Sequence, residues 1–283
     1  MAVVAERRLS QMPWWLWPTV LCGLAPLAAW SWQSLFTDVT NARLPTAAHQ
    51  ALALVVWVIA LADRLLDARR RATWRHWFAG RYRLPMAILL GVALIVCYRL
   101  LFWYLPQVIL TLGIFLGVPI LFYLFFARLD IGPRAALPRE IVRGALFSAG
   151  VLLPTYAMAS VPPAALQLMI SQTLLVSLIF LGSTCREHID RPEEAEHHEE
   201  WEAIDSRLGV WLFLLFGTVL WLARVESKQP GNAMMAYYAV MAVVTLISLG
   251  LYSMRKRISP DTLHTLSWLA LSLPLVAQFF FKG

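Results

Sequence analysis

The sequence is dominated by apolar runs that are each about as long as a lipid bilayer is thick. An α-helix needs about 20 residues to cross the hydrocarbon core, and nine stretches of the chain are apolar over comparable lengths. They occupy residues 13–36, 47–66, 84–104, 106–127, 141–160, 162–182, 208–225, 233–253 and 263–281. We therefore predict an all-α polytopic membrane protein, with nine transmembrane helices that form a single domain over residues 1–283.

The composition excludes an ordinary soluble domain. Hydrophobic residues make up 59% of the chain and charged residues 14%, and the mean hydropathy is +0.63. Soluble domains have about 25% charged residues. The three cysteines are scattered and show no CxxC spacing, so they indicate neither a metal motif nor a disulfide framework.

Basic residues are distributed unevenly over the links between the predicted spans. When the links alternate between the two sides, with the amino terminus inside, 19 of the 24 basic residues fall on the inner side. The outer side holds Arg43, Arg99, Arg224, Lys228 and Lys282. The positive-inside rule therefore predicts the N-terminus inside and the C-terminus outside. Membrane lipids with anionic headgroups account for the net charge of +7, so no nucleic-acid partner is expected.

Two groups of carboxylates belong to the predicted inner face. Asp63 and Asp67 are four residues apart at the end of the second span, so on a helix they share one face. A charge at the mouth of a membrane span is costly unless it has a partner or lines a wet cavity. The second group lies in the stretch from Glu187 to Asp205. This stretch contains nine of the 17 acidic residues. Opposed carboxylates of this kind indicate a functional site.

Arginines accompany both acidic groups. Arg64, Arg70 and Arg71 are close to the first group, and Arg186 and Arg191 flank the start of the second. Carboxylates suit Mg²⁺, which takes oxygen ligands and keeps several waters, and arginine forks orient phosphate groups. The pattern therefore predicts a site for Mg²⁺ and a phosphate-bearing ligand on the inner face.

Nine spans with acidic motifs after the second and sixth resemble the UbiA superfamily of intramembrane prenyltransferases. Its first motif reads N-D-x-x-D-x-x-x-D, and Asp63 and Asp67 match the last two aspartates, with Ile59 and Ala60 at the first two positions. Its second motif closes with two aspartates four apart. Asp190 and Glu194 match that pair, with glutamate at the second position.

The resemblance implies transfer of a prenyl chain from an isoprenyl diphosphate to an aromatic or lipid acceptor, in a bacterial cytoplasmic (inner) membrane. Asp63, Asp67 and Asp190 would be the catalytic residues. Together with Glu194 and Glu187 they would hold Mg²⁺, and the five arginines named above would bind the diphosphate. Trp57 would line the cavity for the chain, because aromatic faces stabilise a developing carbocation.

Other readings of these residues remain open. Asp63 and Asp67 also fit helix-end residues paired with nearby arginines, and the charge run from Glu193 to Glu202 fits a solvated surface segment. A relative that has lost catalysis and binds a lipid or a quinone is the main alternative function. A transporter is the third, although the sequence shows no paired broken helices or internal repeat of the kind that transporters have.

Overall fold

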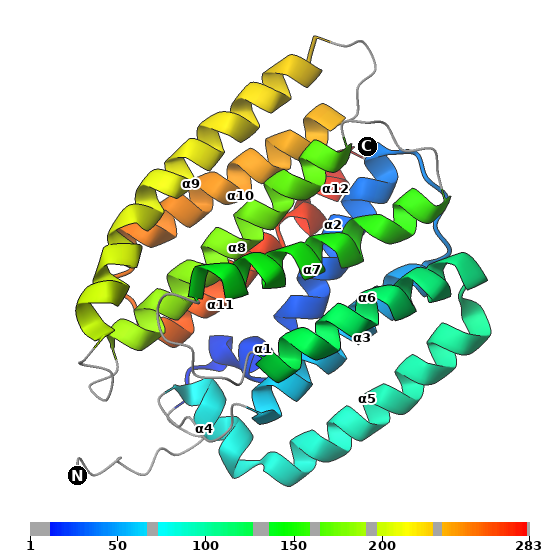
Figure 1. Cartoon of the computed structure of the whole chain (residues 1–283), viewed down its shortest axis with the longest axis horizontal. Coiled ribbons are helices and arrows are strands. Elements are labelled where there is room, and N and C mark those ends of the chain that lie inside the picture. Colours follow the sequence, from blue (N-terminus) through cyan, green and yellow to red (C-terminus); the bar gives the residue numbers. More distant parts are fainter. Residues whose placement is uncertain are drawn as a thin grey trace.

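The computed structural model describes residues 12–66, 73–126, 136–158, 165–190, 197–228 and 234–281. All the regular structure in these ranges is helical (Figure 1). The elements are η2 (Trp14–Leu16), α1 (Trp17–Val20), α2 (Leu24–Val39), α3 (Thr46–Leu66), α4 (Trp74–Arg81), α5 (Arg83–Tyr104), α6 (Gln107–Phe126), α7 (Ala136–Met158), α8 (Ala165–Ile189), α9 (His198–Glu226), α10 (Met234–Met254), α11 (Pro260–Leu271) and α12 (Pro274–Phe281).

Seven of the described helices, α3 and α5 to α10, are long and apolar enough to cross a membrane. They overlap the second to eighth predicted spans, although α8 and α9 extend beyond the predicted bounds, to Ile189 and from His198. The prediction of an all-helical protein with membrane-length helices is confirmed for the described residues. The third and fourth predicted spans are separate helices, α5 and α6. Leu105 is extended between them, as expected for a residue that precedes proline, and α6 begins directly after Pro106.

The first predicted span, residues 13–36, is not one continuous helix. α1 ends at Val20, α2 begins at Leu24, and Cys22 between them has a left-handed φ of 58°. The amide of Gly23 donates to the carbonyl of Pro18 at 2.7 Å, which is the closing bond of a helix-terminating turn. α2 alone has 16 residues, fewer than the about 20 that a crossing needs.

The last predicted span, residues 263–281, is also divided. Ser259 caps the start of α11, because its hydroxyl oxygen accepts a hydrogen bond from the Thr262 amide at 3.2 Å. The helix ends at Leu271, and Pro274 begins α12. A proline has no amide hydrogen to donate and its ring clashes with the carbonyl four residues before it, so one straight helix does not continue through this point. Nine complete spans and the orientation of the termini stay predictions.

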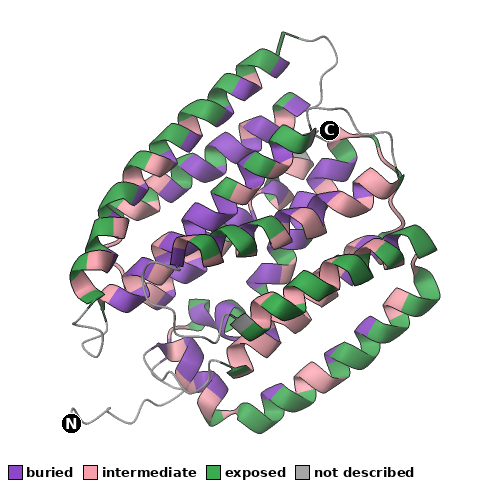
Figure 2. Cartoon of the chain, viewed as in Figure 1, coloured by how far each residue is buried: buried purple, intermediate pink, exposed green. Residues whose placement is uncertain are grey.

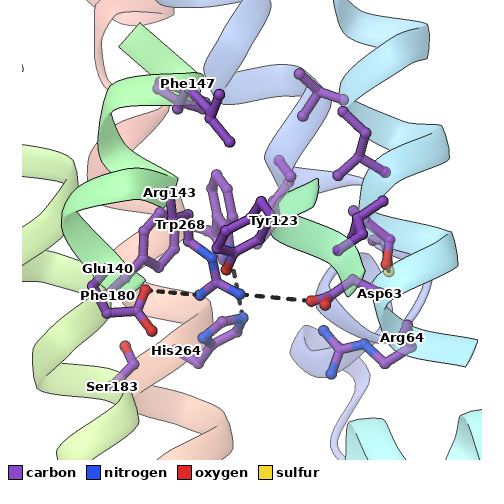
Figure 3. Close-up of a pocket in the computed structure, with 18 of the residues that line it drawn as sticks. Asp63, Arg64, Tyr123, Glu140, Arg143, Phe147, Phe180, Ser183, His264 and Trp268 are labelled. Carbon is purple, nitrogen blue, oxygen red and sulfur yellow. Dashed lines mark hydrogen bonds and ion pairs between the residues drawn. The ribbon is translucent and has the colours of Figure 1, made fainter. Parts of the chain in front are cut away.

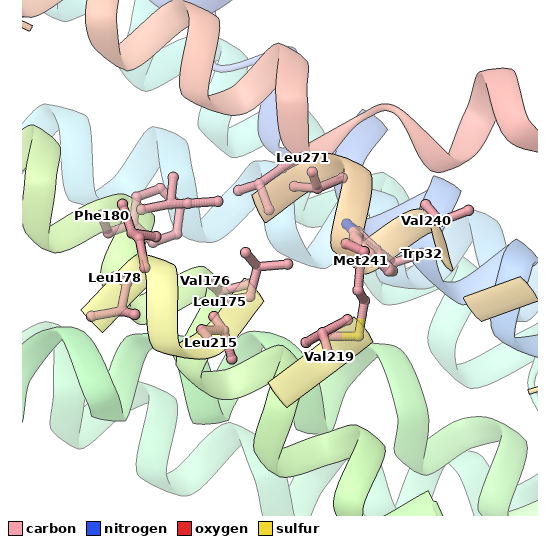
Figure 4. Packing of buried hydrophobic residues seen from close by; sticks show 14 of the residues in the cluster. Trp32, Leu175, Val176, Leu178, Phe180, Leu215, Val219, Val240, Met241 and Leu271 are labelled. Carbon is pink, nitrogen blue, oxygen red and sulfur yellow. The ribbon is translucent and has the colours of Figure 1, made fainter. Parts of the chain in front are cut away.

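Helix α8 lies at the centre of the main core. It packs against α7, α9 and α11, and its side chains meet those of α2, α9 and α10 (Figure 4). Leu175, Leu181 and Leu208 are fully or almost fully buried there. Buried leucines of α8 and α9 therefore lie at the centre of this core.

The outer helices expose apolar side chains instead of burying them. α5, α6 and the outer face of α9 are largely exposed in Figure 2, and the exposed residues include Ile95, Phe115 and Phe213. A large exposed apolar surface marks contact with lipid or another protein. On membrane-length helices this pattern is typical of a lipid-facing surface.

Candidate functional site

A cavity of about 250 Å³ lies between α3, α6 and α7 and extends to α8 and α11. Its two ends differ sharply in chemistry (Figure 3). One end is largely apolar, and three helices supply many of the apolar lining residues. These are Leu52, Val55, Val56 and Ile59 of α3, Leu116, Ile120 and Leu124 of α6, and Leu146 and Phe147 of α7. The other end collects charged and polar groups from the ends of α3 and α8 and from the starts of α4, α7 and α11.

Glu140 is the most deeply buried charge at this polar end, with no exposed surface. It faces two arginines of its own helix, Arg139 Nη2 at 3.3 Å and Arg143 Nη1 at 3.1 Å. The hydroxyl of Thr184 on α8 donates to Glu140 Oε1 at 3.1 Å. Arg143 then reaches across the cavity, so that its Nη2 lies 3.6 Å from Asp63 Oδ2 on α3. This row of charges joins α3, α7 and α8.

Aromatic rings surround the Arg143 guanidinium. Its central carbon lies 5.1 Å from the centre of the Phe180 ring and 5.9 Å from that of Tyr123. A guanidinium over a ring face at this distance is stabilised by a cation–π interaction. Phe180 packs in turn against Trp268 in a tilted arrangement, with 4.8 Å between the ring centres and 60° between the ring planes. Arg143 is therefore held in a fixed place at the boundary between the apolar and polar parts.

A second charged network ties the short helix α4 to this end. Arg75 of α4 is buried and forms an ion pair with Glu187 of α8. Its Nε lies 3.9 Å from Asp261 Oδ1 at the start of α11, and the amide of Trp74 donates to Asp261 Oδ2 at 2.7 Å. His76 Nδ1 lies 3.5 Å from Glu187 Oε1. These bonds hold α4 over the polar end of the cavity.

His264 of α11 lines the same end. The indole of Trp268 donates to His264 Nε2 at 3.1 Å. An indole N–H can only donate, so Nε2 is an acceptor and the proton of the neutral imidazole is on Nδ1. That Nδ1 is buried and has no hydrogen-bond partner among the described residues.

Several residues proposed from the sequence line the cavity together. Asp63 and Arg64 reach it from α3, and Glu187 reaches it from α8. Asp190 and Arg186 instead pair with each other at 2.9 Å at the end of α8 and are not among the lining residues. Asp67, Arg70, Arg71, Arg191 and Glu194 lie outside the described residues.

Trp57 does not line the cavity, contrary to the role assigned to it from the sequence. Its indole donates to the carbonyl of Leu21 at 3.0 Å, and its ring packs in a separate apolar cluster near Phe78 and Met86. On the 3.6-residue period, Trp57 lies on nearly the opposite side of α3 from Ile59, one of the lining residues. The apolar lining is aliphatic on α3, and Phe147 is the aromatic residue on its α7 side.

The described carboxylates of the cavity are each paired with an arginine. No group of three His, Cys, Asp or Glu side chains converges within the described ranges. Asp63, Glu140 and Glu187 are instead separated by the arginines that pair with them. Mg²⁺ usually binds through one or two carboxylates together with phosphate oxygens and waters, so its role in this cavity stays a prediction.

Three residues central to the site were not assigned to it from the sequence: Glu140, Arg143 and His264. The spacing of Glu140 and Arg143, three apart at the start of a span, was a usable signal, because such a pair shares a helix face. His264 had only the weak signal of a single histidine in an apolar run.

Comparison with models of protein families, with curated proteins and with solved structures gives no match.

Proposed function

We propose that the protein binds an isoprenyl diphosphate, or a lipid phosphate of the same shape, in this cavity. The observation that carries the proposal is the division of one cavity into an aliphatic part and an arginine-rich part. An amphipathic ligand would place its chain among the side chains of α3, α6 and α7, and its phosphates near the basic groups of the polar end. Such a pocket, mostly apolar with a few convergent polar groups, is the usual form of a ligand site.

The narrower proposal is transfer of the prenyl chain to an aromatic or lipid acceptor. Two features support it. The aromatic rings of Phe180 and Trp268 stand where the apolar and polar parts meet, and ring faces stabilise a developing allylic cation. The arginines beside them could balance the negative charge of a departing diphosphate. A role of Mg²⁺ through Asp67 and Glu194 remains part of this narrower proposal.

Binding without catalysis is the second candidate. The observation that favours it is the pairing of Asp63, Glu140 and Glu187 with cations of the protein itself. A relative that holds a lipid without transforming it would need no free carboxylate in the lining.

One experiment separates these possibilities. The purified protein in detergent is incubated with geranylgeranyl diphosphate, and both bound lipid and released pyrophosphate are measured, with Mg²⁺ or with EDTA. Saturable binding with pyrophosphate release that depends on Mg²⁺ is the result expected of a prenyltransferase. Binding without release, across several chain lengths and with lipid extract as the acceptor source, supports the binding protein. Absence of saturable binding in every condition would contradict both.

A further inference from the structure

The arginines that line the cavity differ in how far they are already neutralised. Three of the four are paired with carboxylates, two with Glu140 and one with Glu187. Arg64 is different, because it lies beside the Cys22 thiol and makes no ion pair with any carboxylate in the described ranges. A guanidinium that is not paired with a described carboxylate is the one best able to attract an anion from outside.

His264 adds a second unused donor at the same end of the cavity. The hydrogen bond from Trp268 fixes the proton of the neutral ring on Nδ1, and that buried N–H has no acceptor in the part of the chain that is described. A buried donor without a partner is unfavourable, so its presence beside a cavity points to an acceptor supplied by a ligand. Figure 3 shows the Arg64 guanidinium and the His264 imidazole at the same, polar end.

We infer that Arg64 and His264 together bind the phosphate of the ligand, and that they do so without a bridging divalent cation. The inference rests on the proposed function, since it assigns the headgroup contacts of that same ligand. Arg64 supplies the charge, and His264 supplies a neutral N–H whose direction is set by Trp268. The arginines already paired with carboxylates shape this end of the cavity and are not the primary phosphate ligands.

The test measures dissociation constants in detergent for two ligands with the same chain. Geranylgeranyl phosphate carries the anion, and geranylgeraniol lacks it. In EDTA, Arg64→Gln and His264→Leu are each expected to weaken binding of the phosphate by about tenfold or more, which corresponds to about 1.4 kcal/mol. Their affinity for geranylgeraniol is expected to stay within about twofold of wild type, because the chain contacts are unchanged. A misfolded variant would instead lose affinity for both ligands.

Two further variants sharpen the assignment. His264→Asn keeps an N–H near the position of Nδ1 and is expected to retain most of the affinity that His264→Leu loses. Arg224→Gln removes an exposed arginine of α9, outside the cavity, and serves as the matched control for Arg64→Gln. Unchanged phosphate binding in both Arg64→Gln and His264→Leu would overturn the inference.

Binding in EDTA is also compared with binding in Mg²⁺, which tests the inference independently of the variants. Replacing EDTA by Mg²⁺ is expected to change the affinity of the wild-type protein for geranylgeranyl phosphate by less than about threefold. Binding that vanishes in EDTA and returns with Mg²⁺ would overturn the inference while leaving the proposed function intact. A wild-type protein that binds neither ligand in either buffer would overturn the proposed function itself, and the inference with it.

Discussion

Replacing Glu140 by leucine is expected to destabilise the folded protein by about 3 to 5 kcal/mol. The carboxylate has no exposed surface and is the shared partner of Arg139 and Arg143. Without it, two guanidiniums remain at a partly buried place with only Asp63 nearby. An unbalanced charge in a low-dielectric surrounding costs much more than the lost pair itself contributed.

The measurement for Glu140 is thermal or denaturant unfolding in detergent, followed by circular dichroism. Glu202→Leu is the matched control, because Glu202 belongs to a surface pair with His198 and its side chain is 61% exposed. Exposed pairs contribute about 0 to 1 kcal/mol, so the control is expected to unfold close to wild type. Equally small losses of stability in the two variants would contradict the buried ion pairs of Glu140 with Arg139 and Arg143.

Replacing Gly144 by alanine is expected to destabilise the protein by about 1 to 3 kcal/mol through overpacking. α7 and α8 approach closely at this residue. A Cβ on Gly144 would lie only 2.6 Å from the carbonyl oxygen of Thr173 and 3.1 Å from the amide nitrogen of Ser177. Both are backbone atoms of α8 and cannot rotate away. The two helices would have to separate, and the neighbouring Glu140 and Arg143 would move with them.

Gly113→Ala provides the control for Gly144→Ala. Gly113 is also in a membrane-length helix, α6, but a Cβ there meets nothing within 4 Å. The same methyl group is therefore expected to leave stability unchanged or slightly raised, because alanine has the higher helix propensity. Equal melting temperatures for the two variants would contradict the close contact between α7 and α8.

The membrane-length helices could be predicted from the sequence because each consists of about 20 apolar residues, and that requirement is local. The breaks at the two ends of the chain were missed for a different reason. Mean hydropathy depends only on how apolar a stretch is. It therefore shows neither the left-handed turn at Cys22 nor the start of a new helix at Pro274. Both signals were present in the sequence, since Pro18, Gly23 and Pro274 are residues that commonly end or begin helices.

The candidate site could be predicted only where its residues stand near an acidic motif. Asp63, Arg64 and Glu187 were proposed from the sequence, and all three line the cavity. Glu140 and His264 depend on how α7 and α11 pack against α8, which is a property of tertiary structure. Pairing of Asp63 with an arginine was an open reading of the sequence, but its partner, Arg143 on α7, depends on the same packing.

The most direct test of the account is whether the apolar part of the cavity holds the chain of the ligand. Gly150→Leu would fill that part without altering a charge, because a Cβ on Gly150 already lies 3.3 Å from Leu52 Cδ1 and 3.9 Å from Leu116 Cδ2. Gly117→Leu is the control, since Gly117 is not a lining residue and its Cβ would meet nothing within 4 Å.

The quantity to measure is the dissociation constant for geranylgeranyl diphosphate in detergent, for the wild type and both variants. The account predicts saturable binding by the wild type and by Gly117→Leu, and an affinity at least about tenfold lower for Gly150→Leu. Binding by Gly150→Leu that equals the wild type would contradict the placement of the chain between α3, α6 and α7.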